Sequence, residues 1–160
     1  FTCCIAIRFG KIQHLSLKCM VTGRGRIKML KGHCECGRVT FEVDSGVRDF
    51  SHCHCSQCRR LHGAAYGTFA GVPREAFKYM TGEDDVKFYW SSEKNKRVFC
   101  GNCGSNIMVV DNTDPDDFYL SMSTIEDDPE LPEGYHIWVS SKAPWHEIND
   151  DLPQFEKWNK

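Results

Sequence analysis

Seven cysteines lie in three clusters whose short spacing suits the binding of metal ions. They are the pairs Cys34-x-Cys36 and Cys100-x-x-Cys103 and the triplet Cys53-x-Cys55-x-x-Cys58. Four cysteine sulfurs complete the tetrahedral shell of a structural zinc site. Three sulfurs leave one position free, as catalytic zinc sites do. The clusters therefore predict two zinc sites with different roles.

The two pairs are predicted to share one zinc ion. Glycines flank both, in the segments Gly32-His33-Cys34-Glu35-Cys36-Gly37 and Phe99-Cys100-Gly101-Asn102-Cys103-Gly104. Glycine permits the tight turns, including positive φ angles, that bring both sulfurs of a pair to one side. One C-x-x-C pair is a weak signal, but two such pairs in one small domain are a strong one. We expect these four cysteines to meet across a sheet as a single site.

The triplet leaves its fourth ligand open. His52, His54 and His62 are candidates, although His54 lies between two ligands and is expected to point away from their metal. If a histidine binds, the site is closed and structural; if none does, water or an external thiol completes it. A zinc dication with three thiolates has a net negative charge and is a poor Lewis acid. Such a site suits exchange of a soft thiolate, which favours a thiol substrate over a zinc-hydroxide hydrolase.

Two arginines, Arg59 and Arg60, follow the triplet directly. In the simpler interpretation they are surface charges paired with acidic residues elsewhere in the chain. In the functional interpretation Arg59 meets a substrate carboxylate, because a guanidinium can donate two parallel hydrogen bonds to a carboxylate. The sequence contains no Ser-His-Asp signature, phosphate-binding loop or dinucleotide fingerprint.

Composition indicates a soluble globular protein. The 160 residues are 41% hydrophobic and 26% charged, and no apolar run approaches the roughly 20 residues of a membrane span. Residues 1–31 carry seven Lys or Arg and no acid, which leaves thirteen basic and twenty-two acidic residues, a net charge of -9, in the remainder. An acidic body disfavours general nucleic-acid binding. We therefore expect neither a nucleic-acid nor a membrane partner.

The N-terminal segment is predicted to lie outside the fold. It lacks the long apolar region and small-residue cleavage site of a secretory signal, and its three cysteines have no ligand spacing. Thiols that bind metal need a reducing compartment, so we expect a cytoplasmic protein. We predict an appended extension over residues 1–28 and one zinc-binding domain over residues 29–160. A flexible natural tail is the alternative, and a basic arm for nucleic acids is the weakest interpretation.

From residue 30 onward the pattern is mainly β, with few short helices. Val39, Phe41 and Val43 alternate with polar residues, as in a strand with one buried face. Further predicted strands are residues 66–71, 86–90, 97–100, 106–110, 118–122 and 136–139. Residues 56–62 are predicted to form a short helical turn after the triplet, and residues 73–77 another turn that begins with proline.

Taken in this order, the three clusters resemble those of the glutathione-dependent formaldehyde-activating enzyme (Gfa) family. The matching segments are residues 32–39, 53–59, 99–104 and 136–145, and the resemblance covers about residues 30–158. It implies a small zinc-binding β-tent fold built from antiparallel sheets. It also implies a structural zinc at Cys34, Cys36, Cys100 and Cys103, and a second zinc near glutathione at Cys53, Cys55 and Cys58.

The same resemblance implies an activity. Family members are described as carbon–sulfur lyases that interconvert S-hydroxymethylglutathione with glutathione and formaldehyde. It implies that this chain acts on an adduct of an aldehyde with glutathione or another small thiol, at the zinc of the triplet. We therefore predict Cys53, Cys55 and Cys58 as the catalytic residues, and Arg59, on its chemistry and position alone, as the residue that binds the thiol substrate. The alternative is a non-catalytic zinc-binding module, or a thiol or metal carrier, in which His52 or His62 closes the second site.

Overall fold

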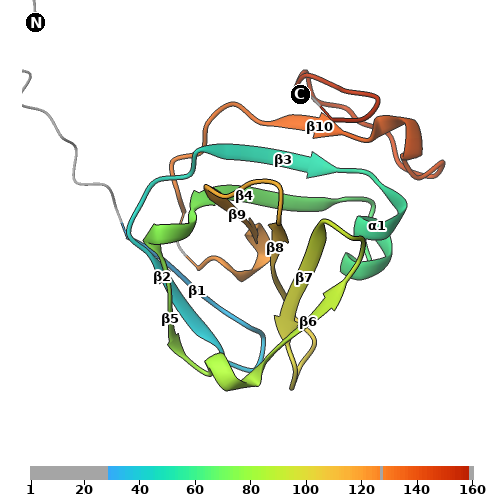
Figure 1. The fold of residues 1–160 in the computed structure, drawn as a ribbon. Helices are drawn as coiled ribbons and strands as arrows, with labels where there is room; N and C mark the ends of the chain where they lie inside the picture. Colours follow the sequence, from blue (N-terminus) through green and yellow to red (C-terminus); the bar gives the residue numbers. More distant parts are fainter. Residues whose placement is uncertain (1–28, 127, 159–160) are drawn as a thin grey trace, which may run out of the picture.

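The computed structural model describes residues 29–126 and 128–158, and ten strands in these residues form two sheets. The smaller sheet is antiparallel, with the order β1 (Leu30–His33), β2 (Thr40–Val43) and β5 (Phe77–Thr81). The larger sheet has seven strands in the order β10-β3-β4-β9-β8-β7-β6. Figure 1 shows β3 and β10 together at one side of the molecule and the smaller sheet at another. The extension predicted over residues 1–28 lies outside the described residues.

The larger sheet is mixed, because one of its pairs is parallel. Its strands are β3 (Asp49–Cys53), β4 (Gly67–Pro73), β6 (Val86–Trp90), β7 (Asn95–Cys100), β8 (Asn106–Asp111), β9 (Asp117–Ser121) and β10 (Tyr135–Ile137). All neighbours run antiparallel except β10 and β3. The expectation of purely antiparallel sheets therefore needs this one correction. The chain reaches β10 through the long connection 122–134 rather than a hairpin, and such a connection can return the chain in the parallel direction.

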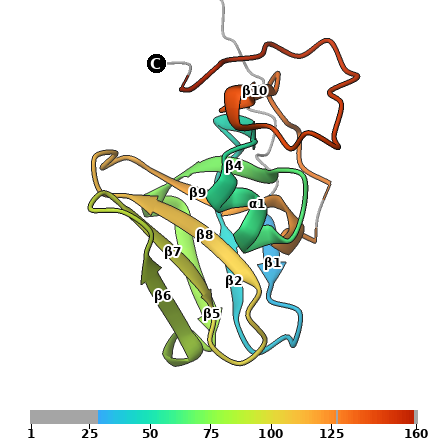
Figure 2. The same ribbon diagram turned by 90° about the vertical axis from the view of Figure 1, so that its right-hand side faces the viewer.

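The helical segments are short, as the sequence predicted. Among the described residues the one α-helix is α1 (Ser56–His62), and the 3-10 turns are η1 (Arg74–Ala76), η2 (Glu83–Asp85), η3 (Met122–Thr124) and η4 (Val139–Ser141). Figures 1 and 2 both place α1 and the C-terminal segment at the same end of the molecule. Of the helices in the described residues, none is both long and apolar enough to cross a membrane.

The seven-stranded sheet uses its two faces for different purposes. Successive side chains of a strand point to opposite faces, so Met108 and Val110 enter the main core between the sheets while Val109 faces the other side. In β7, Val98 enters the main core and Arg97 takes the opposite face. Full burial of each large apolar side chain stabilises the fold by about 1.5–3 kcal/mol. The second face is thus free to line a site.

Six predicted strands are confirmed as β4, β6, β7, β8, β9 and β10, with shifts of one or two residues at their ends. The strand predicted over Val39, Phe41 and Val43 is β2, which begins one residue after Val39, at Thr40. Pairing also creates β1, β3 and β5, which the sequence pattern did not reveal because they are short and carry polar residues. The β10 strand ends early because Trp138 has the left-handed φ of 59°.

Candidate functional site

The two cysteine pairs form one compact cluster. The sulfurs of Cys34, Cys36, Cys100 and Cys103 lie within 4.8 Å of one another. The Cys36 sulfur lies 3.5 Å from that of Cys34 and 3.9 Å from that of Cys100. Zinc–sulfur bonds of about 2.3 Å in a tetrahedron place sulfurs about 3.8 Å apart. The four side chains therefore fit a tetrahedral metal ion, as the spacing predicted.

Two tight turns present these sulfurs. The turn after β1 closes when the Gly37 N–H donates to the Cys34 carbonyl at 2.9 Å, and the turn after β7 closes when Gly104 donates to Cys100 at 2.9 Å. Both glycines have positive φ, 71° and 80°. Gly101 does not; it is needed for close approach, since a Cβ there would lie 2.9 Å from the Asp85 carbonyl oxygen.

Hydrogen bonds around this cluster favour the thiolate form that binds metal. The Arg38 backbone and the Asn102 amide lower the pKa of Cys36, and Asn102 Nδ2 donates to the Cys36 sulfur at 3.3 Å. Interactions with Ser105 lower the pKa of Cys103 to about 5. The two exposed members of the cluster therefore ionise more easily than ordinary thiols.

The triplet forms a second cluster at the junction of β3 and α1. Cys53 ends β3, Cys55 is the N-cap of α1, and Cys58 lies in the first turn of that helix. Their sulfurs also lie within 4.8 Å of one another, and the Cys55 sulfur accepts the Cys58 backbone N–H at 3.3 Å. Cys53 and Cys58 are buried, and Cys55 is half-buried. One short segment thus wraps three sulfurs around a single point.

The three thiols of the triplet differ in how easily they lose their protons. Hydrogen bonds from the Cys53 and Cys58 thiols lower the pKa of Cys55, whereas the hydrogen bond to Cys55 and burial raise the pKa of Cys53. Three thiolates this close repel one another, and a divalent cation removes that repulsion. The donor set therefore suits a thiophilic metal ion such as zinc.

The three candidate histidines face other partners. The His54 ring is fully buried and its Nε2 lies 2.8 Å from His136 Nδ1, while His136 Nε2 lies 3.0 Å from Asp150. His52 bonds Thr68 at 3.2 Å, and His62 packs edge-on against an aromatic ring. Within residues 29–126 and 128–158, the group of side chains able to hold this metal consists of the three cysteines. This arrangement fits the open form of the site and the expectation that His54 points away.

A backbone hydrogen bond of His54 fixes the positions of Cys53 and Cys55 on either side of it. Its N–H donates to the Ile137 carbonyl at 2.9 Å, which ties the segment between Cys53 and Cys55 to the end of β10. Burial and the neighbouring His136 lower the pKa of His54 to about 4. The ring is therefore neutral near pH 7.

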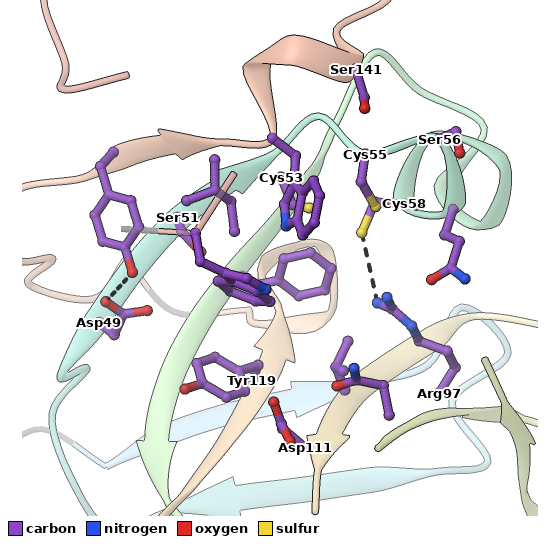
Figure 3. Close-up of a pocket in the computed structure, with 18 residues that line it drawn as sticks. Asp49, Ser51, Cys53, Cys55, Ser56, Cys58, Arg97, Asp111, Tyr119 and Ser141 are labelled. Atoms are coloured by element: carbon purple, nitrogen blue, oxygen red, sulfur yellow. Dashed lines mark hydrogen bonds between the residues drawn. The ribbon is translucent and has the colours of Figure 1, made fainter. Parts of the chain in front are cut away.

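A cavity of about 390 Å³ opens beside the triplet; all three of its cysteines line this cavity, and none of the four paired cysteines does. Figure 3 shows the three sulfurs at one end of it, with aromatic rings along the walls. The aromatic residues that line it are Phe69, Tyr119, Tyr135, Trp138 and Trp158, and its charged lining residues are Asp49, Arg97 and Asp111. A small molecule in this cavity can place one end against the sulfurs and the rest among the rings.

The cavity contains an arginine other than the one expected. Arg59 and Arg60 are not among its lining residues; Arg60 bonds its own helix at 3.4 Å. Arg97 lines the cavity and directs Nη1 to the Cys58 sulfur at 3.7 Å. The position of Arg97 on the strand that ends at Cys100 could have predicted its place in the cavity. Side chains alternate along a strand, so when Cys100 points to the core, Arg97 points to the opposite face.

Comparisons with known proteins agree with this arrangement. The family model for the glutathione-dependent formaldehyde-activating enzyme matches residues 29–141. A putative glutathione-dependent formaldehyde-activating enzyme from Halomonas elongata is 30% identical over 128 residues, which cover 75% of this chain and 81% of that protein. An uncharacterized lyase from Schizosaccharomyces pombe is 22% identical over 91 residues, covering 57% and 64% of the two chains. A crystal structure of a Rhodobacter sphaeroides protein superposes with a TM-score of 0.53 and 26% identity over 61% of this chain and 89% of that chain.

Proposed function

Because the chain belongs to the glutathione-dependent formaldehyde-activating enzyme family, we propose that it is a zinc-dependent carbon–sulfur lyase. Its substrate is an adduct of an aldehyde with a small thiol, such as S-hydroxymethylglutathione. Cys34, Cys36, Cys100 and Cys103 hold a structural zinc, and Cys53, Cys55 and Cys58 hold a catalytic one. The protein acts in the cytoplasm, where thiols stay reduced, and has no nucleic-acid or membrane partner.

One observation carries this proposal: the cavity adjoins the cluster of three sulfurs. A structural site is closed by four protein ligands, whereas a catalytic site keeps a position for substrate. Cys53, Cys55 and Cys58 all line the cavity. A ligand in the cavity can therefore reach the free position of the triplet, while the four-cysteine cluster already has its full set of sulfurs.

The chemistry requires a thiolate to leave or attack. When bound, zinc supplies a site that keeps the substrate sulfur ionised near pH 7. In the lyase direction the C–S bond breaks, its electron pair stays on sulfur, and the adduct hydroxyl loses its proton to water as the aldehyde forms. The residues of the chain orient this adduct: the triplet fixes the sulfur end, and Phe69 and Trp138 cover the rest and exclude water.

The test is native mass spectrometry of zinc-loaded protein with and without glutathione. We expect two zinc ions per chain and one glutathione adduct. Cys55→Ser should lose the adduct, the second zinc and lyase turnover while remaining folded. Arg60→Gln is the matched control on the same helix, because this arginine lies outside the cavity; it should keep both zinc ions and the adduct.

Turnover by folded Cys55→Ser would contradict the proposal. One zinc and no adduct in the wild-type protein would also contradict it and would favour the alternative, a non-catalytic zinc-binding module. A bound thiol without any lyase turnover would indicate a thiol carrier. The open triplet beside a cavity is the observation that keeps the carrier as the second candidate.

A further inference from the structure

Arg97 is the feature of the cavity that the proposed lyase chemistry does not use. Its relative exposure is 9%, so more than nine-tenths of the residue is buried. Its Nε donates to the Ser91 hydroxyl at 3.1 Å and its Nη1 to the Cys58 sulfur at 3.7 Å. For Nη2 the residues that the structure describes provide no hydrogen-bond partner.

Such a guanidinium needs a charge partner. Arginine stays protonated in proteins, and burying a charge is costly unless it is paired and hydrogen-bonded. No carboxylate in the described part of the chain lies within 4.0 Å of Arg97. The Cys58 sulfur accepts one hydrogen bond from Arg97 at 3.7 Å, and this contact occupies only one edge of the planar group. The other edge remains available to a ligand.

The carboxylates of the cavity are engaged elsewhere. Asp49 accepts a hydrogen bond from the Tyr135 hydroxyl at 2.7 Å, and Asp111 accepts from the backbone N–H and hydroxyl of Thr113 at 2.8 and 2.7 Å. Figure 3 shows Arg97 reaching toward the sulfurs, with Asp49 at the opposite side of the cavity. Arg97 is also the only Lys or Arg among the described lining residues. The positive end of the cavity is therefore the end where the substrate sulfur lies.

We propose that Arg97 binds a carboxylate of the substrate thiol, and that the natural substrate is accordingly a thiol that carries a carboxylate within a few bonds of its sulfur. This inference rests on the proposed function, because it requires a thiol at the triplet. It assigns to Arg97 the role that the sequence suggested for Arg59. The guanidinium fork suits this role, since it can donate parallel hydrogen bonds to both oxygens of a carboxylate.

The test compares two thiols of the same length on zinc-loaded protein by isothermal titration calorimetry. One is 3-mercaptopropionate and the other 3-mercaptopropanol, which has an uncharged CH2OH group in place of the carboxylate. We expect the wild-type protein to bind the carboxylate about 10- to 100-fold more tightly, as a charge-assisted hydrogen bond provides. In Arg97→Gln this ratio should fall to near one, with the affinity for 3-mercaptopropanol unchanged. Intrinsic differences between the thiols cancel when the ratio is compared between variants.

Three further variants make the result decisive. Arg59→Gln tests the rival arginine, and Arg60→Gln is the control outside the cavity; both should keep the wild-type ratio. Arg97→Lys retains the charge but loses the fork, so the ratio should fall only in part. Zinc content and thermal unfolding are measured for each. If Arg97→Gln does not fold, the Arg97→Lys ratio decides: a reduced ratio supports the inference and an unchanged one overturns it.

The outcomes separate this inference from the proposed function. If the wild-type protein binds both thiols equally, the thiol site stands and the role of Arg97 is overturned. The same holds if Arg97→Gln keeps the preference or if only Arg59→Gln loses it. If neither thiol binds the wild-type protein, the proposed function itself fails, and the inference falls with it.

Discussion

The four-cysteine cluster joins two distant turns, whereas the triplet comes from one continuous stretch of six residues. Cys36 and Cys100 are 64 positions apart in the chain, while Cys53 and Cys58 are only five positions apart. A metal ion that closes a long loop removes much conformational freedom from the unfolded chain, and one that closes a short loop removes little. The first cluster is thus placed to stabilise the fold, and the second can serve chemistry at a small cost in stability.

The two cysteine clusters also differ in the apolar residues that pack around them. Cys34 and Cys100 belong to the main core between the sheets, so the larger of the two apolar clusters anchors this set of sulfurs. Cys53 and Cys58 belong to the smaller apolar cluster behind the cavity. The same amino acid is therefore used for cross-linking in one region and for ligand access in the other. The following predictions test that difference.

The largest effect is expected from Cys100→Ser. Structural zinc sites contribute an apparent binding free energy of about 10–16 kcal/mol to small domains, which is comparable with the whole stability of a domain. We expect this variant to lose one zinc and its cooperative thermal transition in circular dichroism. Cys55→Ser, as the matched variant of the triplet, should unfold within a few degrees of the wild-type protein. Equal melting temperatures for Cys100→Ser and the wild type would refute the structural role of the first cluster.

Metal release should separate the clusters in time. With a chromogenic chelator we expect two phases, and the faster one belongs to the triplet because a cavity exposes its free position. A tenfold difference in rate corresponds to a barrier difference of about 1.4 kcal/mol. Cys55→Ser should lack the fast phase, and glutathione should slow it in the wild-type protein. A single phase that accounts for both ions would mean that the two clusters hold metal alike.

Two glycines provide the smallest and most local comparison. Gly82 (φ 68°) packs against the turn of the first cluster, and a Cβ there would lie 2.3 Å from the Arg38 carbonyl oxygen. Gly63 (φ 59°) ends α1 beside the triplet, with no heavy atom within 4 Å of such a Cβ. Gly63→Ala should cost about 1 kcal/mol from the left-handed conformation alone, and Gly82→Ala about 3 kcal/mol because a backbone clash is added. Urea denaturation measures both, and equal costs would show that the Gly82 contact contributes nothing.

The sequence predicted the grouping of the cysteines better than it predicted the cavity. Ligand identity follows from local spacing, so Cys53, Cys55 and Cys58 could be grouped before any fold was known. The neighbours of the cavity come from β4, β7, β8, β9 and the C-terminal segment, and only strand pairing brings them together. Arg97 shows why local spacing could not predict the cavity. It lies 39 residues from Cys58 in the sequence, yet the two side chains are in contact.

The strands, too, could be predicted only where the local sequence pattern was enough to indicate them. Those with several apolar residues, such as β8 (Asn106–Asp111), were visible as periodic patterns. The β3 strand (Asp49–Cys53) was not, because Ser51 and His52 are polar although pairing with β4 places Ser51 in a buried position. A periodic sequence pattern indicates a strand when apolar side chains fill its buried positions. It does not indicate a strand whose buried positions hold hydrogen-bonding groups and cysteines.

The C-terminal segment has a consequence for how substrate preference can change. Hydrogen bonds from His136 to Pro153 and from Trp138 to Lys157 hold this segment against β10, and Trp158 reaches the cavity. The part of the chain that the family model matches ends at residue 141, and one residue that lines the cavity, Trp158, lies beyond it. A substitution at Trp158 can therefore change the shape and the chemistry of the cavity while all seven clustered cysteines stay in place.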